Sequence, residues 1–152
     1  MKVKYSWQDL ERDCQDLAAR ILALRVEEGF DPSIVLGVAR GGLIPAVLLA
    51  RLLDLRPVAS VSCAGYDGDR KAGGVTLVLP FPLTPPCEHS HVLVVDDVAD
   101  TGETLALVQQ ELLRRHFQFR AVTLHYKPQS KVLPYLYCWK TTDWIVYPWE
   151  VE

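Results

Sequence analysis

The chain has 152 residues, 49% of them apolar, and a formal net charge of −3 with a pI near 5.8. This length can bury one sizeable core but is short for two ordinary domains, so we expect a single domain over residues 1–152. The acidic balance argues against a broad nucleic-acid surface, which normally shows a basic excess. The start of the chain has no apolar core of signal-peptide length, and arginines and glycines interrupt the longest apolar stretch, residues 34–53. We therefore expect a cytoplasmic chain that does not enter a membrane.

Apolar periodicity and turn residues predict alternating helices and strands along the chain. Ser6 and Asp9 have the spacing of a helix start. In chain order the predicted elements are a helix over 6–28, a strand over 34–38, a helix over 43–53, a strand over 58–63, a flexible connection over 65–74, a strand over 75–81, a proline-rich loop, a strand from 91, a helix over 103–116, a strand over 120–126 and a short aromatic-rich tail. This alternation predicts an α/β fold, with a mainly parallel twisted sheet flanked by helices and joined by right-handed crossovers.

Residues 92–104 read Val-Leu-Val-Val-Asp-Asp-Val-Ala-Asp-Thr-Gly-Glu-Thr and hold the strongest clue to function. The apolar run predicts a strand buried on both faces, with Asp96 and Asp97 at its carboxyl end, the edge where open α/β sheets bind ligands. The turn over 100–104 supplies free backbone N–H groups, hydroxyls and the positive end of a helix dipole, which suit a phosphate. Gly102 lets the backbone approach that anion. Carboxylates beside such a turn suit a sugar phosphate, because they accept hydrogen bonds from its hydroxyls.

Four other kinds of segment can carry parts of this acidic sequence, namely a solvated turn, a receiver domain, an aspartic protease and a calcium loop. A lone Asp-Asp pair at a strand end is more often a solvated turn than a site. A receiver domain can carry Val-Val-Asp-Asp, but near its start, whereas Asp97 lies past the middle of this chain. Aspartic proteases share Asp-Thr-Gly, but Ser or Ala usually follows, where this chain has Glu103. The spacing of Asp96, Asp97 and Asp100 also lacks the alternate oxygen ligands of a calcium loop.

The whole segment resembles the phosphoribosyl-pyrophosphate signature of type I phosphoribosyltransferases. The resemblance continues through Gly-Val-Ala-Arg-Gly-Gly at 37–42, Lys127-Pro128, and Trp-Ile-Val-Tyr-Pro-Trp-Glu at 144–150, so it covers most of residues 34–150. The acidic Asp100 is similar to the 6-oxopurine enzymes, and the chain looks closest to the short xanthine-guanine and archaeal-type hypoxanthine-guanine members. The resemblance implies the type I fold with a small C-terminal hood segment.

The resemblance also implies an activity. It indicates a purine-salvage enzyme that transfers the 5-phosphoribosyl group from phosphoribosyl pyrophosphate to a 6-oxopurine, giving the nucleoside monophosphate and pyrophosphate. Guanine and hypoxanthine are favoured over xanthine. The implied cofactor is Mg²⁺, which keeps near-octahedral oxygen ligands and would be carried mostly by the substrate. The implied partners are the sugar diphosphate and a purine base, and relatives are commonly homodimers or homotetramers.

The family pattern assigns the sugar diphosphate to two loops. Asp96 and Asp97 match the pair that engages the ribose hydroxyls, directly or through Mg²⁺. Asp100 matches the residue that faces the purine nitrogen opposite the new bond, where it can act as general base. The other phosphoribosyl-pyrophosphate-binding residues, in the 5-phosphate cradle and the pyrophosphate loop, are Thr101, Gly102, Glu103, Thr104, Arg40 and Gly41. By itself the pyrophosphate loop could be only a tight strand-to-helix turn, but in the family it often holds a cis peptide, so we expect a cis Ala39–Arg40 bond.

Three residues match the family's purine site. Lys127 precedes Pro128, which favours an extended backbone at a strand end, and it matches a lysine that donates to the carbonyl oxygen of a 6-oxopurine. Trp144 matches an aromatic that stacks on the purine. Ile145 matches a residue whose backbone carbonyl reads the exocyclic group. The alternative for the tryptophan is an ordinary core or interface position.

Residues 66–73 resemble a flap that closes over the site, with Arg70 or Lys71 reaching the pyrophosphate. A plain hairpin loop fits that segment equally well. Glu150 lies where relatives have a further acidic residue, and the sequence leaves its role open.

The alternative function is a non-catalytic, phosphoribosyl-pyrophosphate-binding regulator of nucleotide metabolism, since this fold also serves regulators. Such proteins usually add a DNA-binding domain or a basic RNA-binding face, and the sequence predicts neither. The combination of Asp100, Lys127 and Trp144 favours the enzyme.

Overall fold

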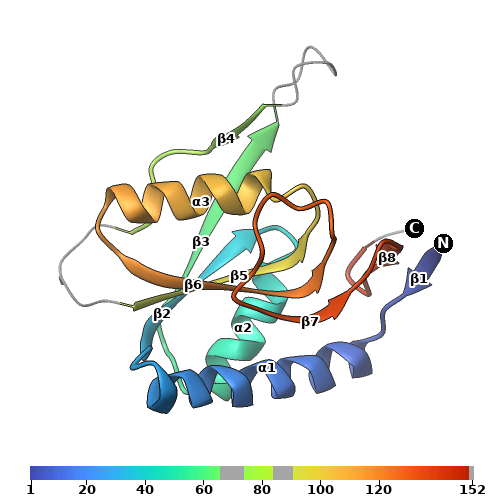
Figure 1. Cartoon of the computed structure of the whole chain (residues 1–152), viewed down its shortest axis with the longest axis horizontal. Coiled ribbons are helices and arrows are strands. Elements are labelled where there is room, and N and C mark those ends of the chain that lie inside the picture. Colours follow the sequence, from blue (N-terminus) through green and yellow to red (C-terminus); the bar gives the residue numbers. More distant parts are fainter. Residues whose placement is uncertain (66–73, 84–90, 151–152) are drawn as a thin grey trace.

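The computed structural model describes residues 1–65, 74–83 and 91–150, and Figure 1 shows how the helices and strands of these residues are arranged. The flap candidates Arg70 and Lys71 lie outside the described residues. The described helices are α1 (Trp7–Glu27), α2 (Leu43–Leu52) and α3 (Glu103–Arg114). The described strands are β1 (Lys2–Lys4), β2 (Pro32–Ala39), β3 (Val58–Gly65), β4 (Val75–Leu77), β5 (His91–Ala99), β6 (Gln118–Tyr126), β7 (Leu136–Lys140) and β8 (Trp144–Val146).

The three predicted helices are all present, and each end lies within two residues of its prediction. The strand predicted over 75–81 is too long, because β4 ends at Leu77. Pro80 follows in a cis peptide bond with Leu79, and a proline cannot donate to a strand ladder. The structure adds β1, β7 and β8, which no sequence pattern predicted.

Six strands form one sheet in the order β4-β3-β2-β5-β6-β7. Every neighbouring pair is parallel except β3 and β4, which are antiparallel. β5 lies between β2 and β6, with Val95 opposite Gly37 on one side and Val122 on the other. Because the carboxyl ends of parallel strands meet at one edge, the segments that follow β2, β5 and β6 come together there. The predicted mainly parallel α/β sheet is confirmed.

Helices cover both faces of this sheet (Figure 1). On one face α1 and α2 pack on side chains such as Leu93 and Val95 of β5. On the other face α3 packs on Val92 and Val94 of the same strand. All four are at most 1% exposed, so β5 is buried on both faces, as its continuous apolar run predicts. The polar residues that end this strand are therefore held by a rigid core.

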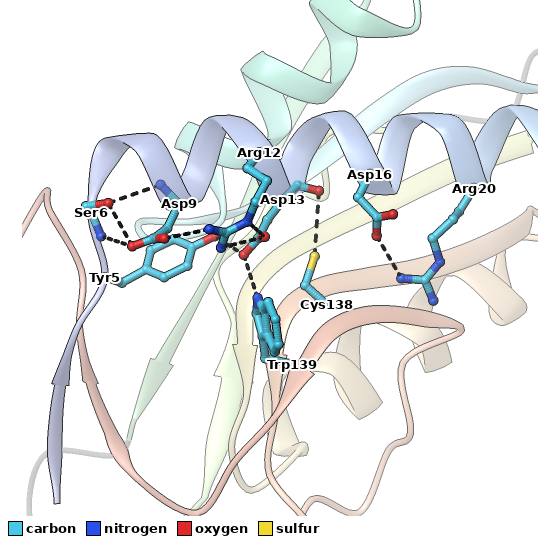
Figure 2. A network of polar contacts seen from close by, with 9 residues as sticks. All are labelled: Tyr5, Ser6, Asp9, Arg12, Asp13, Asp16, Arg20, Cys138 and Trp139. Atoms are coloured by element: carbon cyan, nitrogen blue, oxygen red, sulfur yellow. Dashed lines mark hydrogen bonds and ion pairs between the residues drawn. The ribbon is translucent and has the colours of Figure 1, made fainter.

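A buried carboxylate ties α1 to the last strand of the sheet (Figure 2). Asp13 is 3% exposed. Its Oδ2 accepts hydrogen bonds from Tyr5 Oη and Trp139 Nε1, both at 2.7 Å, and its Oδ1 accepts one from Arg12 Nε at 3.0 Å. With these donors the buried charge is compensated. Figure 2 also shows the reciprocal bonds between Ser6 and Asp9, which form a capping box at the helix start that their spacing predicted.

The C-terminal hood is a small second layer beside the sheet edge. β8 pairs in parallel with β1, with Trp144 opposite Lys2 and Ile145 opposite Val3, and Figure 1 shows these strands side by side near the two ends of the chain. The first residues of the chain thus support the segment that was expected to hold the purine. None of the described helices combines the length and apolar character needed to cross a bilayer.

Candidate active site

The loop after β2 lies directly against the end of β5. The Ala39–Arg40 peptide bond is cis, as expected. A Cβ atom on Gly41 would overlap Asp97 Oδ2 and lie 2.6 Å from Asp97 Cγ, while one on Gly42 would lie 2.5 Å from the carbonyl oxygen of Val95. These close contacts account for both glycines, as a tight strand-to-helix turn requires, and pyrophosphate binding by this loop stays a prediction. Arg40 between them and β2 is exposed, so its guanidinium is accessible to an anion.

Asp96 and Asp97 form the acidic floor of the site. Asp96 is 8% exposed, and its Oδ1 accepts a hydrogen bond from the backbone N–H of Asp97 at 2.9 Å. Asp97 Oδ1 accepts one from the backbone N–H of Val98 at 2.7 Å. Burial raises the pKa of Asp96 well above its usual value, and the neighbouring charge of Asp97 raises it further. Burial likewise raises the pKa of Asp97. A ligand that brings hydroxyl donors or positive charge would relieve this cost.

The turn after β5 begins α3 through Gly102, which has a φ of +80° and is the N-cap residue. A Cβ atom there would lie 2.5 Å from Ser130 Oγ and 2.7 Å from the backbone nitrogen of Val132. Thr101 Oγ1 accepts from the backbone N–H of Glu103 at 3.3 Å. The Glu103 carboxylate pairs with Lys131 at 3.3 Å. Gly102 is thus needed for its backbone angle and for packing on the segment after β6, two reasons beyond the anion approach that the sequence suggested.

Replacing Gly102 with alanine should destabilise the fold by roughly 2–4 kcal/mol, the sum of a left-handed backbone and an overlap with two neighbours. Thermal and urea unfolding would measure the loss. Gly29→Ala is the matched control, because Gly29 has a φ of +67° but nothing within 4 Å of a Cβ, so it should lose only the backbone part. Equal losses in the two variants would show that the 130–132 segment adds no steric cost.

Lys127 lies between Asp100, in the turn after β5, and Trp144, in the C-terminal hood. Its ammonium lies 3.4 Å from Asp100 Oδ2 and 5.6 Å from the ring centroid of Trp144. Lys127 is 8% exposed, whereas Trp144 is 59% exposed. The backbone N–H of Lys127 donates to the carbonyl oxygen of Ala99 at 2.9 Å, and this bond holds the end of β6 against the end of β5. A buried ammonium, a carboxylate and an open aromatic face therefore meet at one edge of the sheet.

Some contacts at this edge were not anticipated. Gln129 Nε2 donates to Asp100 Oδ1 at 2.9 Å, so Asp100 is held by two side chains. Glu150 Oε2 accepts from the backbone N–H of Tyr147 at 3.2 Å, which gives Glu150 a role in the hood turn. Ile145 is 7% exposed and packs in the core beside α1, so only its backbone is available to a ligand.

The most distinctive unexpected contact joins the hood to β5. Tyr147 Oη donates to the backbone carbonyl oxygen of Asp97 at 3.2 Å, and His125 Nδ1 lies 3.0 Å from the same hydroxyl. Burial lowers the pKa of His125 to about 4, so its ring is neutral at pH 7. Nothing in the sequence pattern singled out Tyr147 or His125, because the bond from Tyr147 ends on a backbone carbonyl and His125 contacts only the Tyr147 hydroxyl, 22 residues away in the chain.

A mainly parallel sheet with acidic strand-end residues between two glycine loops, and a C-terminal hood beside them, defines a protein of the type I phosphoribosyltransferase class. The chain belongs to the phosphoribosyl transferase domain family, which matches it over residues 5–152. The family resemblance of residues 92–104 is therefore confirmed.

Individual relatives agree with this assignment. The chain is 31% identical over 148 residues to a xanthine-guanine phosphoribosyltransferase of Cereibacter sphaeroides, and the match covers 96% of this chain and 85% of that protein. Its structure resembles a purine phosphoribosyltransferase from Pyrococcus horikoshii, with a TM-score of 0.84, 33% identity and coverage of 99% and 95%. It also resembles a hypothetical protein from Neisseria gonorrhoeae with bound ppGpp, with a TM-score of 0.81, 28% identity and coverage of 99% and 90%. The relatives with named activities are enzymes, and so is this chain.

Proposed function

We propose that the chain transfers the 5-phosphoribosyl group of phosphoribosyl pyrophosphate to a 6-oxopurine, guanine or hypoxanthine in preference to xanthine. The observation that carries the proposal is the Lys127 ammonium, 3.4 Å from Asp100 Oδ2 and 5.6 Å from the Trp144 ring centroid. A 6-oxopurine offers a carbonyl oxygen to an ammonium, an N–H to a carboxylate and a π-face to an indole. Its three features match these three side chains.

The sugar diphosphate would occupy the adjoining loops. Asp96 and Asp97 accept hydrogen bonds from the ribose hydroxyls, and the turn over 101–104 holds the 5-phosphate at the amino end of α3. The exposed Arg40 and the backbone of Gly41 bind the pyrophosphate. Held in this way, the anomeric carbon loses pyrophosphate while the purine nitrogen approaches from the opposite side. Positioning and electrostatic stabilisation of the positive charge on the ribose supply most of the acceleration.

Asp100 acts as the general base in this proposal. When the new bond forms, the opposite nitrogen of the purine ring becomes more acidic, and Asp100 accepts its proton. Lys127 donates to the carbonyl oxygen and so favours the 6-oxopurine over adenine. Its position next to Asp100 also means that the two groups orient each other before the base arrives.

Mg²⁺ is the proposed cofactor. The donor set fits a hard ion with oxygen ligands, because Asp96 and Asp97 are adjacent carboxylates at the ligand edge of the sheet. Within residues 1–65, 74–83 and 91–150, no group of three or more His, Cys, Asp or Glu side chains is placed to hold an ion. The substrate's hydroxyls and pyrophosphate would therefore supply the other ligands. When bound, the ion neutralises charge on the leaving pyrophosphate.

The test is a comparison of guanine, hypoxanthine, xanthine and adenine, each mixed with the protein, Mg²⁺ and phosphoribosyl pyrophosphate. Chromatography would follow the nucleoside monophosphate. We expect turnover with guanine and hypoxanthine, slower turnover with xanthine and none with adenine. The proposal fails if no purine is converted.

The alternative, a regulator that binds phosphoribosyl pyrophosphate without turning it over, is not favoured. The named relatives are transferases. Specific nucleic-acid binding at moderate salt, combined with no turnover of any purine, would reverse the ranking.

We also propose that the chain works as a homodimer or homotetramer. A hollow of about 670 Å³ lies between α1 and α2 and is lined mainly by apolar side chains, of which Trp7 is 54% and Val47 51% exposed. Glu11 and Arg51 border the same hollow, so two copies related by a twofold axis can pair each carboxylate with the other copy's guanidinium. Light scattering should find an oligomer that Val47→Glu disrupts, and a monomeric wild type would refute the proposal.

A further inference from the structure

We propose that Tyr147 is a positioning residue, whose hydroxyl fixes the backbone carbonyl of Asp97 and thereby sets the distance between the purine and ribose halves of the site. His125 supports it through the same hydroxyl. We call these two side chains and the Asp97 carbonyl the hood latch. The inference rests on the proposed function, because it concerns how the two substrates are aligned.

The direction of each hydrogen bond in the latch follows from its chemistry. The backbone carbonyl of Asp97 can only accept, so the proton of Tyr147 Oη points to it across 3.2 Å. Burial and the nearby carboxylates raise the pKa of Tyr147, so this proton is retained. The hydroxyl oxygen then accepts from His125 Nδ1 at 3.0 Å, which requires the neutral tautomer with the proton on Nδ1. The Tyr147 hydroxyl therefore donates to Asp97 and accepts from His125.

The latch is fixed by packing from several parts of the chain. Tyr147 is 3% and His125 6% exposed. The Trp149 ring stacks on Tyr147 at 4.7 Å with an interplanar angle of 8°, and the Tyr5 ring meets His125 edge-on at 5.0 Å. The backbone N–H of Tyr147 is held by Glu150. These contacts restrict Tyr147 to one rotamer, which fixes the position of its hydroxyl.

The place of the latch in the site gives it a role beyond stability. Tyr147 lies three residues after Trp144 on the same hood segment, and Trp144 is the exposed indole expected to hold the purine. Asp97 carries the carboxylate expected to hold the ribose hydroxyls. The Tyr147 bond thus links the hood segment that carries Trp144 to the end of β5 that carries Asp97. An error of about 1 Å in the distance between bound purine and ribose can cost roughly 100-fold in rate.

Tyr147→Phe tests the inference, because it removes one hydroxyl and keeps the ring. We expect kcat with the best purine to fall about 10- to 100-fold, while the Kd of phosphoribosyl pyrophosphate changes less than about 3-fold. Tyr5→Phe is the matched control, because it also removes a buried tyrosine hydroxyl and keeps the ring that packs on His125. The Tyr5 hydroxyl bonds Asp13 on α1, as Figure 2 shows, and has no bond to the hood latch. The control should lose stability and keep kcat.

A second pair of variants covers the case in which Tyr147→Phe does not fold. His125→Asn keeps an N–H donor near the Nδ1 position and should retain most of kcat, whereas His125→Leu has no donor and should lose several-fold. Each rate is compared with the fraction folded, measured by circular dichroism. Wild-type kcat in Tyr147→Phe, or equal rates in both His125 variants, would overturn the inference while wild-type turnover still supports the proposed function. Absence of wild-type turnover would instead refute the proposed function itself.

Discussion

Replacing Asp100 with asparagine is expected to lower kcat by about 10²–10⁴-fold, the usual contribution of a general base. The amide has nearly the same shape, but it cannot take the proton that the purine ring loses when the new bond forms. The Kd of phosphoribosyl pyrophosphate should change little, because the Asp100 carboxylate contacts Lys127 and Gln129 rather than the phosphate turn. Single-turnover rates and calorimetric binding would measure the two quantities separately.

The control for this variant is Asp16→Asn. Asp16 lies on the exposed side of α1 and pairs with Arg20 at 3.3 Å. Asp16→Asn therefore removes one carboxylate charge, as Asp100→Asn does, but far from the site. Its kcat should equal that of the wild type. An unchanged kcat in Asp100→Asn would exclude the general-base role, and a loss confined to phosphoribosyl-pyrophosphate binding would assign Asp100 to the sugar diphosphate instead.

The parts of this structure that the sequence predicted are local in the chain. The run before Asp96 is buried on both faces, and α3 begins at Glu103 as expected. A strand, its carboxylates and the following helix are all specified within residues 92–104, where neighbours in sequence are neighbours in space. The cis bond before Arg40 was also expected, although only from the family resemblance.

The missed parts depend on distant segments. β7 is half-buried and reads Leu-Tyr-Cys-Trp-Lys, which has no clear alternation, and it is placed by Trp139 bonding Asp13 on α1. β1 is exposed along its length and exists because β8 lies beside it. Likewise the acceptor of Tyr147 is a backbone carbonyl fifty residues away. No periodicity or motif encodes such contacts, because the partners lie far apart in the chain, and any residue type can present the carbonyl that Tyr147 bonds.

Replacing Gly41 with alanine is expected to lower kcat/KM for phosphoribosyl pyrophosphate by at least about 100-fold, with the protein still folded. The reason is steric. The added Cβ would overlap Asp97 Oδ2 and approach Asp97 Cγ to 2.6 Å, so the carboxylate must turn away. Turning breaks its 2.7 Å bond from the backbone N–H of Val98 and removes an acceptor from the ribose hydroxyls.

Gly29→Ala again separates this effect from general destabilisation. Gly29 lies before the amino end of β2, at the opposite edge of the sheet from Gly41, and its positive φ means that alanine there costs about 1–2 kcal/mol without meeting any neighbour. Gly29→Ala should therefore lower Tm and leave binding of phosphoribosyl pyrophosphate intact. Gly41→Ala should instead weaken that binding and change Tm little. If Gly41→Ala bound the sugar diphosphate as tightly as the wild type, Asp97 could not be its ribose ligand, and Asp96 alone would have to supply that acceptor.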